Sequence, residues 1–469
     1  MQAVDRIEVR DLHSHGCYRA GIDIGGTFTD LVLIDDETGK QAVGKILTTP
    51  HDPSDAAEEG LFVPVTRLFI RDEPNEELFR IIHANVRMPF EVVGDLYAQA
   101  ASNDVGGARL VGMVEEFDLG DIESLSDEVC TRSERATREA IADLPDGVYK
   151  NEIHADGFDE PIRLAVSIRV DGDEMWVDYG GTSPQSGRGI NVVLNYTAAY
   201  TSFGIKCAIV PEIPNNDGGF RPIHVSAPEG SILNALHPAP VGARHIVGHF
   251  LPGLIHGALE GTIPEKVLAE GAANLWNTQI SGQREDGEPF TYVFFSGGGM
   301  EARPNKDGLS ATAIPSGIRG VPAEVIESIS PVVMHKREFR PDSEGPGQYR
   351  GSFGQQMEIG VRGDSSWVLS AMYDRNEFPA QGMQGGSPGS PGAVRIVDGE
   401  ELHPKRQQRI PAGGRSLLDL PGGGGFGDAC KRVPAKVARD VEEGLYLGRT
   451  RPRGLSCCPE AGSARTLRC

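Results

Sequence analysis

Apolar and polar positions follow three different patterns along the chain. Residues 18–50 alternate as strands do, with the turn residues DDETGK between two runs, and predict a β-hairpin. Residues 75–145 carry apolar side chains at helical spacing and predict helices. Residues 146–430 contain short alternating runs between glycine-rich turns and predict a β-rich body. Within that body, HIVGHFLPGLIHGALEGTI (245–263) predicts a buried helix that breaks at Pro252.

These patterns together predict an α+β protein in which a helical segment precedes a β-rich mixed body. We expect an extension over 1–17, a separate strand-forming segment over 18–61 and one larger domain over 62–445. PAKVARDVEEGL (434–445) predicts a short helix at the end of that domain. Residues 446–469 contain five Arg, one Glu and no hydrophobic period, so we expect them to be disordered.

The overall composition narrows the choice of partners and compartment. The chain has 469 residues and a formal net charge of -22, which disfavours nucleic acid as a partner because phosphate repels an acidic surface. No apolar run approaches the roughly 20 residues that span a bilayer, and the first residues lack the apolar core of a secretory signal. The seven Cys include no CxxC pair and indicate free thiols. We therefore expect no membrane association and a cytoplasmic location.

The segment GIDIGGTFTD (21–30) has the composition of a phosphate-binding hairpin. Gly25 and Gly26 let backbone N–H groups approach a phosphate without an intervening Cβ. Thr27 and Thr29 add hydroxyl donors, and Asp23 at the end of the first run can hold Mg²⁺ through water. The Walker pattern GxxxxGK[ST] is absent, so this is a different kind of phosphate loop.

This segment resembles the first phosphate hairpin of the actin/hexokinase/Hsp70 ATPase superfamily. More narrowly, residues 18–61, which include GKILTTPHDPSDA, resemble the opening of hydantoinase A, the ATP-handling half of the hydantoinase/oxoprolinase family. The resemblance implies that Asp23, Gly25, Gly26, Thr27 and Thr29 bind ATP with Mg²⁺. A second phosphate loop of the same type does not follow later in the sequence, so we expect the hairpin to be a fragment of that ATPase domain.

Residues 61–445 resemble hydantoinase B/oxoprolinase, the partner half of the same family. The resemblance rests on stretches such as WVDYGGTSPQSGRGIN, PEGSILNALHPAPVGARHIVGHFLP and LPGGGGFGD, in the family's own order. The family's N-terminal part, with its NDPxxGGTH-like and HxxDxGG-like stretches, has no counterpart here. Because Glu58–Leu61 (EEGL) fits both halves, we expect a fusion of the start of a hydantoinase A to an N-terminally truncated hydantoinase B domain.

Three histidines are candidate site residues of the B-like body. His245 and His249 stand at i and i+4, with His256 two turns further on, a spacing that suits a metal pair. The Glu of an HExxH motif is missing, so three roles stay open: a structural or pocket-lining role, a metal ligand and a catalytic base. Metal ligands therefore stay unassigned.

Other polar residues have a structural and a functional interpretation. Gly297–Gly299 followed by Arg303 can hold an anion or can form a tight turn. Asp374 and Arg375 indicate an ion pair at the end of a strand, and Cys207 indicates a buried thiol. The glycine run of 420–428 favours a structural role.

The resemblance implies ATP-dependent opening of a cyclic amide such as 5-oxoproline or a hydantoin. Phosphorylation of the carbonyl oxygen turns it into a leaving group, so that water can attack the carbon. The A half holds Mg-ATP and the B half holds the ring, with His245, His249 and Arg303 as candidates on the ring side. We expect a hydantoinase A-type partner and an oligomer, with activity of the truncated chain alone impaired.

Two alternatives remain from the sequence. Acetone- and acetophenone-carboxylase-like subunits resemble the same family and activate ketones by phosphorylation. The chain can also be a non-catalytic scaffold that binds a hydantoinase A partner, since the ATPase lobes and the family's N-terminal stretches have no counterpart in it.

Overall fold

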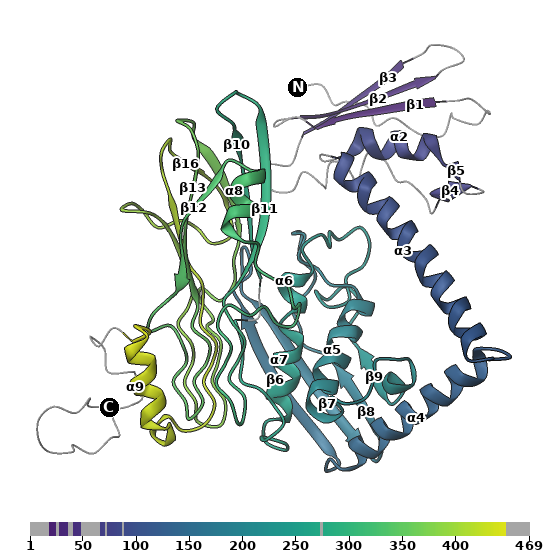
Figure 1. Cartoon of the computed structure of the whole chain (residues 1–469), viewed down its shortest axis with the longest axis vertical. Coiled ribbons are helices and arrows are strands. Elements are labelled where there is room, and N and C mark those ends of the chain that lie inside the picture. Colours follow the sequence, from purple (N-terminus) through teal and green to yellow (C-terminus); the bar gives the residue numbers. More distant parts are fainter. Residues whose placement is uncertain are drawn as a thin grey trace, which may run out of the picture. The chain divides into compact units, whose positions relative to one another are not determined.

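The computed structural model describes residues 18–24, 28–35, 41–47, 66–70, 73–86, 89–272 and 275–446. The chain divides into two compact units, Met1–Ser126 and Asp127–Cys469, and the boundary falls within helix α4 (Glu123–Ala142). Figure 1 shows the elements of each unit in the order of the sequence. Mixed helices and antiparallel sheets confirm the predicted α+β class.

The first unit begins with a three-stranded antiparallel sheet. Its strands β1 (Tyr18–Ile24), β2 (Phe28–Asp35) and β3 (Gln41–Leu47) lie in the order β1-β2-β3. The predicted hairpin is thus present, whereas its relationship to an actin-like ATPase is not confirmed. The extension expected over 1–17 and the tail after Tyr446 lie outside the described residues.

Two helices follow in the same unit. Two paired strands of two residues each, β4 (Phe69–Ile70) and β5 (Glu73–Pro74), come first. They are followed by the helices α2 (Glu76–Asn85) and α3 (Pro89–Glu116). The Asn75 side chain accepts from the backbone N–H of Leu78 and so caps α2. Phe79 and Tyr97 stack at 5.3 Å between ring centroids and join the two helices. The predicted helical segment 75–145 is therefore divided, and Asp118 with a φ of 50° marks the turn between α3 and α4.

The second unit opens with a four-stranded sheet covered by helices. The strands β6 (Gly147–Ala155), β7 (Ile162–Asp171), β8 (Glu174–Asp178) and β9 (Ile223–Ser226) follow one another, and β9 lies parallel to β8. Helices α5 (Leu194–Ile209), α6 (His245–Gly248) and α7 (Leu251–Leu259) complete this half, and α7 packs on β6 and β7 beside α5 (Figure 1). Pro252 lies in the first turn of α7, which confirms the predicted break.

Two further four-stranded sheets share a second hydrophobic core. One has the order β11-β10-β14-β16, and the other has the order β12-β13-β17-β15. Buried side chains from both sheets, including Trp276, Met357, Ile359 and Trp367, meet in this core. The bounds are β10 Leu275–Gln283, β11 Pro289–Gly297, β12 Val332–Phe339, β13 Gln355–Val361, β14 Trp367–Met372, β15 Ala393–Ile396, β16 Gln407–Ile410 and β17 Ser416–Asp419. Helix α8 (Ala323–Ile329), which packs on β12, was not predicted.

Glycine backbones from three loops pack directly on one another in this unit. A Cβ on Gly351 would lie 1.9 Å from the carbonyl oxygen of Gly423, and one on Gly424 would lie 2.0 Å from that of Gln381. Hydrogen bonds cross the same layer, because Gly345 N–H donates to Gly423 and Gly425 N–H donates to Ser387. We call residues 345–354, 381–389 and 422–425 the glycine layer. Its packing agrees with the structural role predicted for the run at 420–428.

Gly351→Ala tests whether the glycine layer needs bare backbone. The added Cβ has no space, so the free energy of unfolding should fall by about 3 kcal/mol or more, the upper end for overpacking. Gly261→Ala is the control, since a Cβ there meets no described atom within 4 Å, and should change the stability by less than about 0.5 kcal/mol. Urea unfolding measures both, and equal stabilities of the two variants would contradict the packing.

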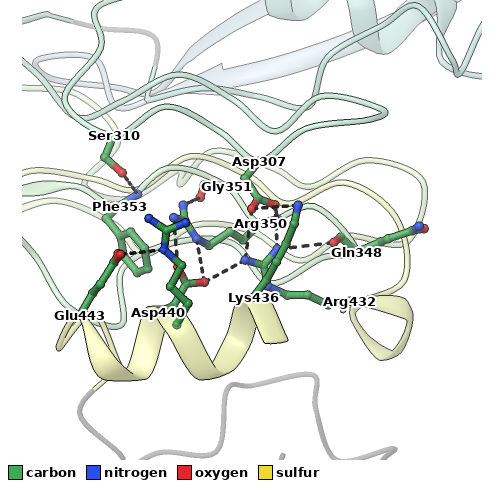
Figure 2. A network of polar contacts seen from close by, with 11 residues as sticks. Asp307, Ser310, Gln348, Arg350, Gly351, Phe353, Arg432, Lys436, Asp440 and Glu443 are labelled. Carbon is green, nitrogen blue, oxygen red and sulfur yellow. Dashed lines mark hydrogen bonds and ion pairs between the residues drawn. The ribbon is translucent and has the colours of Figure 1, made fainter. Parts of the chain in front are cut away.

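A buried ion network fastens the last helix, α9 (Pro434–Glu442), to the loops of the second unit (Figure 2). Asp440 accepts from Arg350 Nε at 3.1 Å and from Arg432 Nη2 at 2.8 Å. Arg432 also donates through Nη1 to Asp307 at 2.7 Å. The side chains of Arg432 and Asp440 are 4% and 8% exposed, so these charges depend on one another for solvation.

Asp440→Ala should destabilise the chain by about 3 kcal/mol, because two buried guanidinium groups lose their shared carboxylate. Arg439→Ala on the same helix removes only an exposed pair with Glu443 and should cost less than about 0.5 kcal/mol. Urea unfolding followed by circular dichroism measures the two values. A small effect of Asp440→Ala would show that water replaces the carboxylate.

Candidate functional site

A small cavity lies in the second unit where α5 and α7 meet the loops around residues 270, 301, 314 and 375. Its volume is about 30 Å³, which is room for about two water molecules. Apolar side chains form part of the wall: Phe203, Phe250, Pro252, Leu268, Ile314 and Pro315. The remaining side chains are polar or ionisable: Cys207, His249, His256, Glu270, Glu301 and Arg375. This mixture of apolar wall and few polar groups is typical of a small-molecule site.

His256 lines the cavity and has one ring nitrogen without a proton. Its Nε2 lies 3.1 Å from the carbonyl oxygen of Gly204, which can only accept, so Nε2 carries the proton and Nδ1 does not. Nδ1 is buried and has no hydrogen-bond partner within the described ranges. Burial lowers the pKa of His256 to about 4, although the bond to Gly204 opposes the shift. The ring is therefore neutral at physiological pH, with an acceptor available.

Glu270 and Arg375 form a buried ion pair beside the cavity. Arg375 Nη1 lies 2.8 Å from Glu270 Oε2, with side chains 3% and 12% exposed. The guanidinium also lies over the ring of Phe250, 4.6 Å from its centroid. The predicted pair between Asp374 and Arg375 is wrong, because each of the two side chains pairs with another residue. Asp374 instead binds Lys405 Nζ at 2.6 Å.

Glu301 is the second carboxyl group of the cavity. It is 8% exposed, and its Oε2 has no hydrogen-bond partner in the part of the chain that the structure describes. Burial raises its pKa to about 7, and the charge of Glu270 adds to this, whereas the charges of Arg375 and Arg303 oppose it. A Cβ on Gly271 would lie 2.4 Å from Oε2, so the backbone there must be glycine to admit the carboxyl group. Glu301 can therefore give or take a proton near neutral pH.

The histidine pair is only partly in this site. His249 lines the cavity, and the His245 ring lies beside it with 5.7 Å between centroids. His245 is not among the lining residues, and burial lowers its pKa with help from the charge of Arg244. Over the described residues, no group of three or more His, Cys, Asp or Glu side chains is arranged to hold a metal ion. The spacing of the two histidines does not by itself build a metal centre.

Arg303 is not among the residues that line the cavity. Its Nη2 donates to the carbonyl oxygen of Asp307 at 2.7 Å, and its charge acts on Glu301 from a distance. A Cβ on Gly298 would lie 2.3 Å from the carbonyl oxygen of Pro421, so close backbone packing explains the glycines that precede Arg303. Cys207 was predicted to be buried, and this is wrong, because α5 leaves it exposed at the cavity. Desolvation and the charge of Glu301 raise the pKa of its thiol.

The predicted ATP loop lies in the first unit. Asp23 belongs to β1 and Thr29 to β2, where Asp23 faces Asp30 and Ile24 faces Thr29 in the strand register. Gly25, Gly26 and Thr27 lie outside the described residues. Binding of Mg-ATP by this loop therefore stays a prediction.

Sequence patterns missed the two glutamates that matter most. Glu270 stands in the apolar run VLAEGAANLW, and Glu301 follows the glycines at the end of β11. A charged residue inside an apolar stretch is the signal that could have found Glu270. For Glu301, the proximity to Glu270 arises only from the tertiary structure.

The fold and cavity define a class of mixed α+β proteins with a small, partly apolar site. The chain belongs to the hydantoinase B/oxoprolinase family, whose model matches residues 42–429. The match begins before residue 61, so it includes part of the segment that resembles hydantoinase A, and that second resemblance is not shown. No helix among the described residues is long and apolar enough to cross a membrane.

Named relatives agree with this family. The chain is 32% identical to the B component of a putative D-/L-hydantoinase of Pseudomonas sp. (strain NS671), over 84% of this chain and 69% of that protein. It is 27% identical to the beta component of the caprolactamase of Pseudomonas jessenii, over 84% and 71%. It is 26% identical to 5-oxoprolinase 1 of Arabidopsis thaliana, over 71% of this chain but 27% of that protein.

Solved structures share the fold. The ATP-dependent caprolactamase from Pseudomonas jessenii has a TM-score of 0.76 at 23% identity, covering 93% of this chain and 82% of that chain. The nucleotide-free acetone carboxylase has a TM-score of 0.72 at 18% identity, covering 91% and 66%. At these identities the likeness concerns the fold.

Glu301→Gln should change how stability depends on pH. The folded pKa of about 7 lies above the ordinary value of 4.5, so the unmodified chain loses stability as pH rises from about 4.5 to 7. The variant lacks this loss and should be more stable by about 3 kcal/mol above pH 7, with a smaller gain at pH 5.5. Urea unfolding at pH 5.5, 6.5 and 8 measures the difference between the variant and the unmodified chain. Burial also raises the pKa of Glu344 to about 7, but Glu344 is present in both chains and its contribution to the difference cancels.

Glu229→Gln is the matched control, because Glu229 is exposed. It should leave stability unchanged at all three pH values. Parallel curves for Glu301→Gln and the unmodified chain would contradict the raised pKa of Glu301.

Proposed function

We propose that this chain is the B-type component of an enzyme that hydrolyses a cyclic amide of the 5-oxoproline or hydantoin class at the expense of ATP. Family membership supports the class, and the names of the relatives include a hydantoinase, a caprolactamase and a 5-oxoprolinase. The observation that carries the site is Glu301, a buried carboxyl group with an orphaned oxygen and a pKa near 7, in a cavity with an apolar wall.

The chemistry follows from the weakness of an amide as an electrophile. The carbonyl oxygen attacks the γ-phosphorus of ATP, the bond from that phosphorus to the bridging oxygen breaks, and ADP leaves. Water then adds to the carbon, and the C–N bond of the ring breaks as the nitrogen takes a proton, which leaves an acyl phosphate. A second water attacks the same carbon, and inorganic phosphate departs with the former carbonyl oxygen. The net reaction converts ATP, two water molecules and the ring into ADP, phosphate and the open-chain acid.

The cavity offers groups for the ring side of this reaction. Its apolar wall limits the access of water to the amide. His256 Nδ1 can accept from a ring N–H, and Glu301 can exchange a proton near neutral pH. His249 lines the cavity, whereas His245 and Arg303 would act from outside the lining.

The phosphate side requires an ATP site. A hydantoinase A-type partner is the proposed source, since two relatives are named as the B and the beta components of their enzymes. The loop that contains Asp23, Gly25, Gly26, Thr27 and Thr29 is a second proposed source within this chain. Carboxylation of a ketone such as acetone is the alternative reaction, and only the shared fold favours it.

Release of phosphate from Mg-ATP tests the proposal. The chain together with the A-type partner of its own source should release phosphate when 5-oxoproline or hydantoin is added, and Glu301→Ala should lower kcat at least about 100-fold. His249→Ala should lower the rate more than His245→Ala, because only His249 lines the cavity. Glu229→Gln is the control and should keep full activity.

The same assay separates the alternatives. Release that depends on acetone and bicarbonate, and not on a cyclic amide, would favour the carboxylase. Release by the chain alone, abolished by Asp23→Ala, would assign ATP binding to its own loop. Absence of release from folded protein in every mixture would leave the scaffold role.

A further inference from the structure

We propose that Arg432 and Asp307 are positioning residues, through which the helix α9 holds the Glu301 carboxyl group in the cavity. Glu301 and Asp307 lie on opposite arms of one short hairpin, residues 299–310, which we call the Glu301 hairpin. The inference concerns the acid of the proposed reaction and so rests on the proposed function. It gives the buried ion network of α9 a role in the site besides its role in stability.

Backbone hydrogen bonds join the two arms of the Glu301 hairpin. Met300 N–H donates to the carbonyl oxygen of Leu309 at 2.8 Å. Nearer the tip, Arg303 N–H donates to the carbonyl oxygen of Lys306 at 3.0 Å. Glu301 lies between these two pairs on the first arm. Its backbone therefore moves only if the second arm moves with it.

Asp307 ties the second arm to α9 and to the residue pair around it (Figure 2). Its carboxylate accepts from the guanidinium of Arg432 at 2.7 and 3.3 Å and from the backbone N–H of Arg350 at 3.0 Å. Lys436 Nζ, from α9 itself, lies 3.6 Å away. Burial raises the pKa of Asp307, but the bond and charge of Arg432, with the charges of Arg350 and Lys436, outweigh this, and the net pKa is lowered. The tether is therefore an ionised carboxylate at neutral pH.

The first arm is held from the opposite side by the glycine layer. Ala302 N–H donates to the carbonyl oxygen of Gly424 at 3.3 Å. The side chain of the next residue, Arg303, reaches the second arm, where its Nη2 donates to the carbonyl oxygen of Asp307 at 2.7 Å. Glu301 thus belongs to a segment with two anchors, one in the glycine layer and one at α9.

This placement matters because burial is the main cause that raises the pKa of Glu301 to about 7, above the ordinary value of 4.5. A hairpin released from α9 would let water reach the carboxyl group, which would lower this pKa. Other titratable and charged groups act on the same carboxyl group or share its cavity: Glu270, Arg375, Arg303, Cys207, His249 and His256. All six are retained when Arg432 is substituted.

Arg432→Met separates position from charge. Loss of the positive charge by itself favours the neutral acid and would raise the pKa of Glu301, whereas release of the hairpin lowers it. We expect the pKa to fall by at least about one pH unit. Infrared titration of the full chain, without ATP or any other protein, follows the C=O band of the protonated acid. Subtraction of the same titration with Glu301→Gln added isolates Glu301 from Glu344, whose pKa burial also raises to about 7.

Two further variants test the geometry of the tether. Arg432→Lys keeps the charge but loses the fork that binds both oxygens of Asp307, so the pKa of Glu301 should fall by a smaller amount. Arg439→Met is the matched control, because it removes an α9 arginine whose side chain is 77% exposed and pairs only with Glu443 among the described residues. It should leave the pKa of Glu301 unchanged.

Amide hydrogen exchange measures the hairpin itself. The N–H groups of Arg303 and Gly308 are hydrogen-bonded in the folded chain. In Arg432→Lys they should exchange at least about tenfold faster than in the unmodified chain, since the arm that holds them is loosened. Arg439→Met should exchange at the unmodified rate. This measurement and the titration of Arg432→Lys carry the test if Arg432→Met does not fold.

The outcomes distinguish this inference from the proposed function. A pKa of Glu301 that stays or rises in folded Arg432→Met would overturn the positioning role, as would unchanged titration and exchange in Arg432→Lys, even if the full enzyme hydrolyses a cyclic amide. A fall in the pKa with faster exchange would support the role even if no phosphate is released, and that result would contradict only the proposed reaction. With an active enzyme, the acidic limb or basic limb that Glu301 sets in the pH–rate profile should move down with the pKa.

Discussion

Direct contact between glycine backbones sets the positions of both cavity carboxyl groups. Gly424 of the glycine layer donates to the carbonyl oxygen of Glu270 at 2.8 Å and accepts from Ala302 N–H at 3.3 Å. Glu270 N–H donates in turn to Gln381 of the same layer. A side chain at Gly424 would lie 2.0 Å from Gln381 O and would push this arrangement apart. Main-chain hydrogen bonds to the glycine layer thus hold two segments that are distant in sequence side by side. These bonds set the distance between Glu270 and Glu301.

Two carboxyl groups in neighbouring positions cannot both ionise easily in a partly buried site. Arg375 pairs with Glu270, because its guanidinium lies 2.8 Å from that carboxyl group, and it also packs over Phe250. Burial raises the pKa of Glu301, and the charges of Arg375 and, to a smaller extent, Arg303 oppose this shift. Burial also raises the pKa of Asp374, although Lys405 Nζ lies 2.6 Å away and opposes the shift. Burial is therefore the main cause of the raised pKa of both carboxyl groups, and nearby cations reduce its effect.

The sequence predicted what depends on local spacing. Helical periodicity located α2, α3 and α4, and alternation located β6 and β7, because each of these signals repeats within a single element. Pro252 gave the break before α7 for the same reason. The pairing of Arg375 with Glu270 and the exposure of Cys207 were missed, since both depend on how loops and α5 pack against distant segments. Glu301 carries no local signal, and its raised pKa arises from neighbours that only the fold supplies.

The close approach of α5 and α7 explains why the cavity contains an acceptor. A Cβ on Gly204 would lie 2.9 Å from Pro252 Cα, so the two helices meet at a contact that admits only glycine on α5. That contact places the carbonyl oxygen of Gly204 within 3.1 Å of His256 Nε2, and the bond fixes the proton on that nitrogen. The other ring nitrogen, Nδ1, must then carry a lone pair and act as an acceptor, whichever ligand enters the cavity. The glycine contact between α5 and α7 thus determines which nitrogen of His256 is the acceptor. In the same way, the glycine contacts between loops determine the position of Glu301. The polar character of the site therefore derives from backbone contacts.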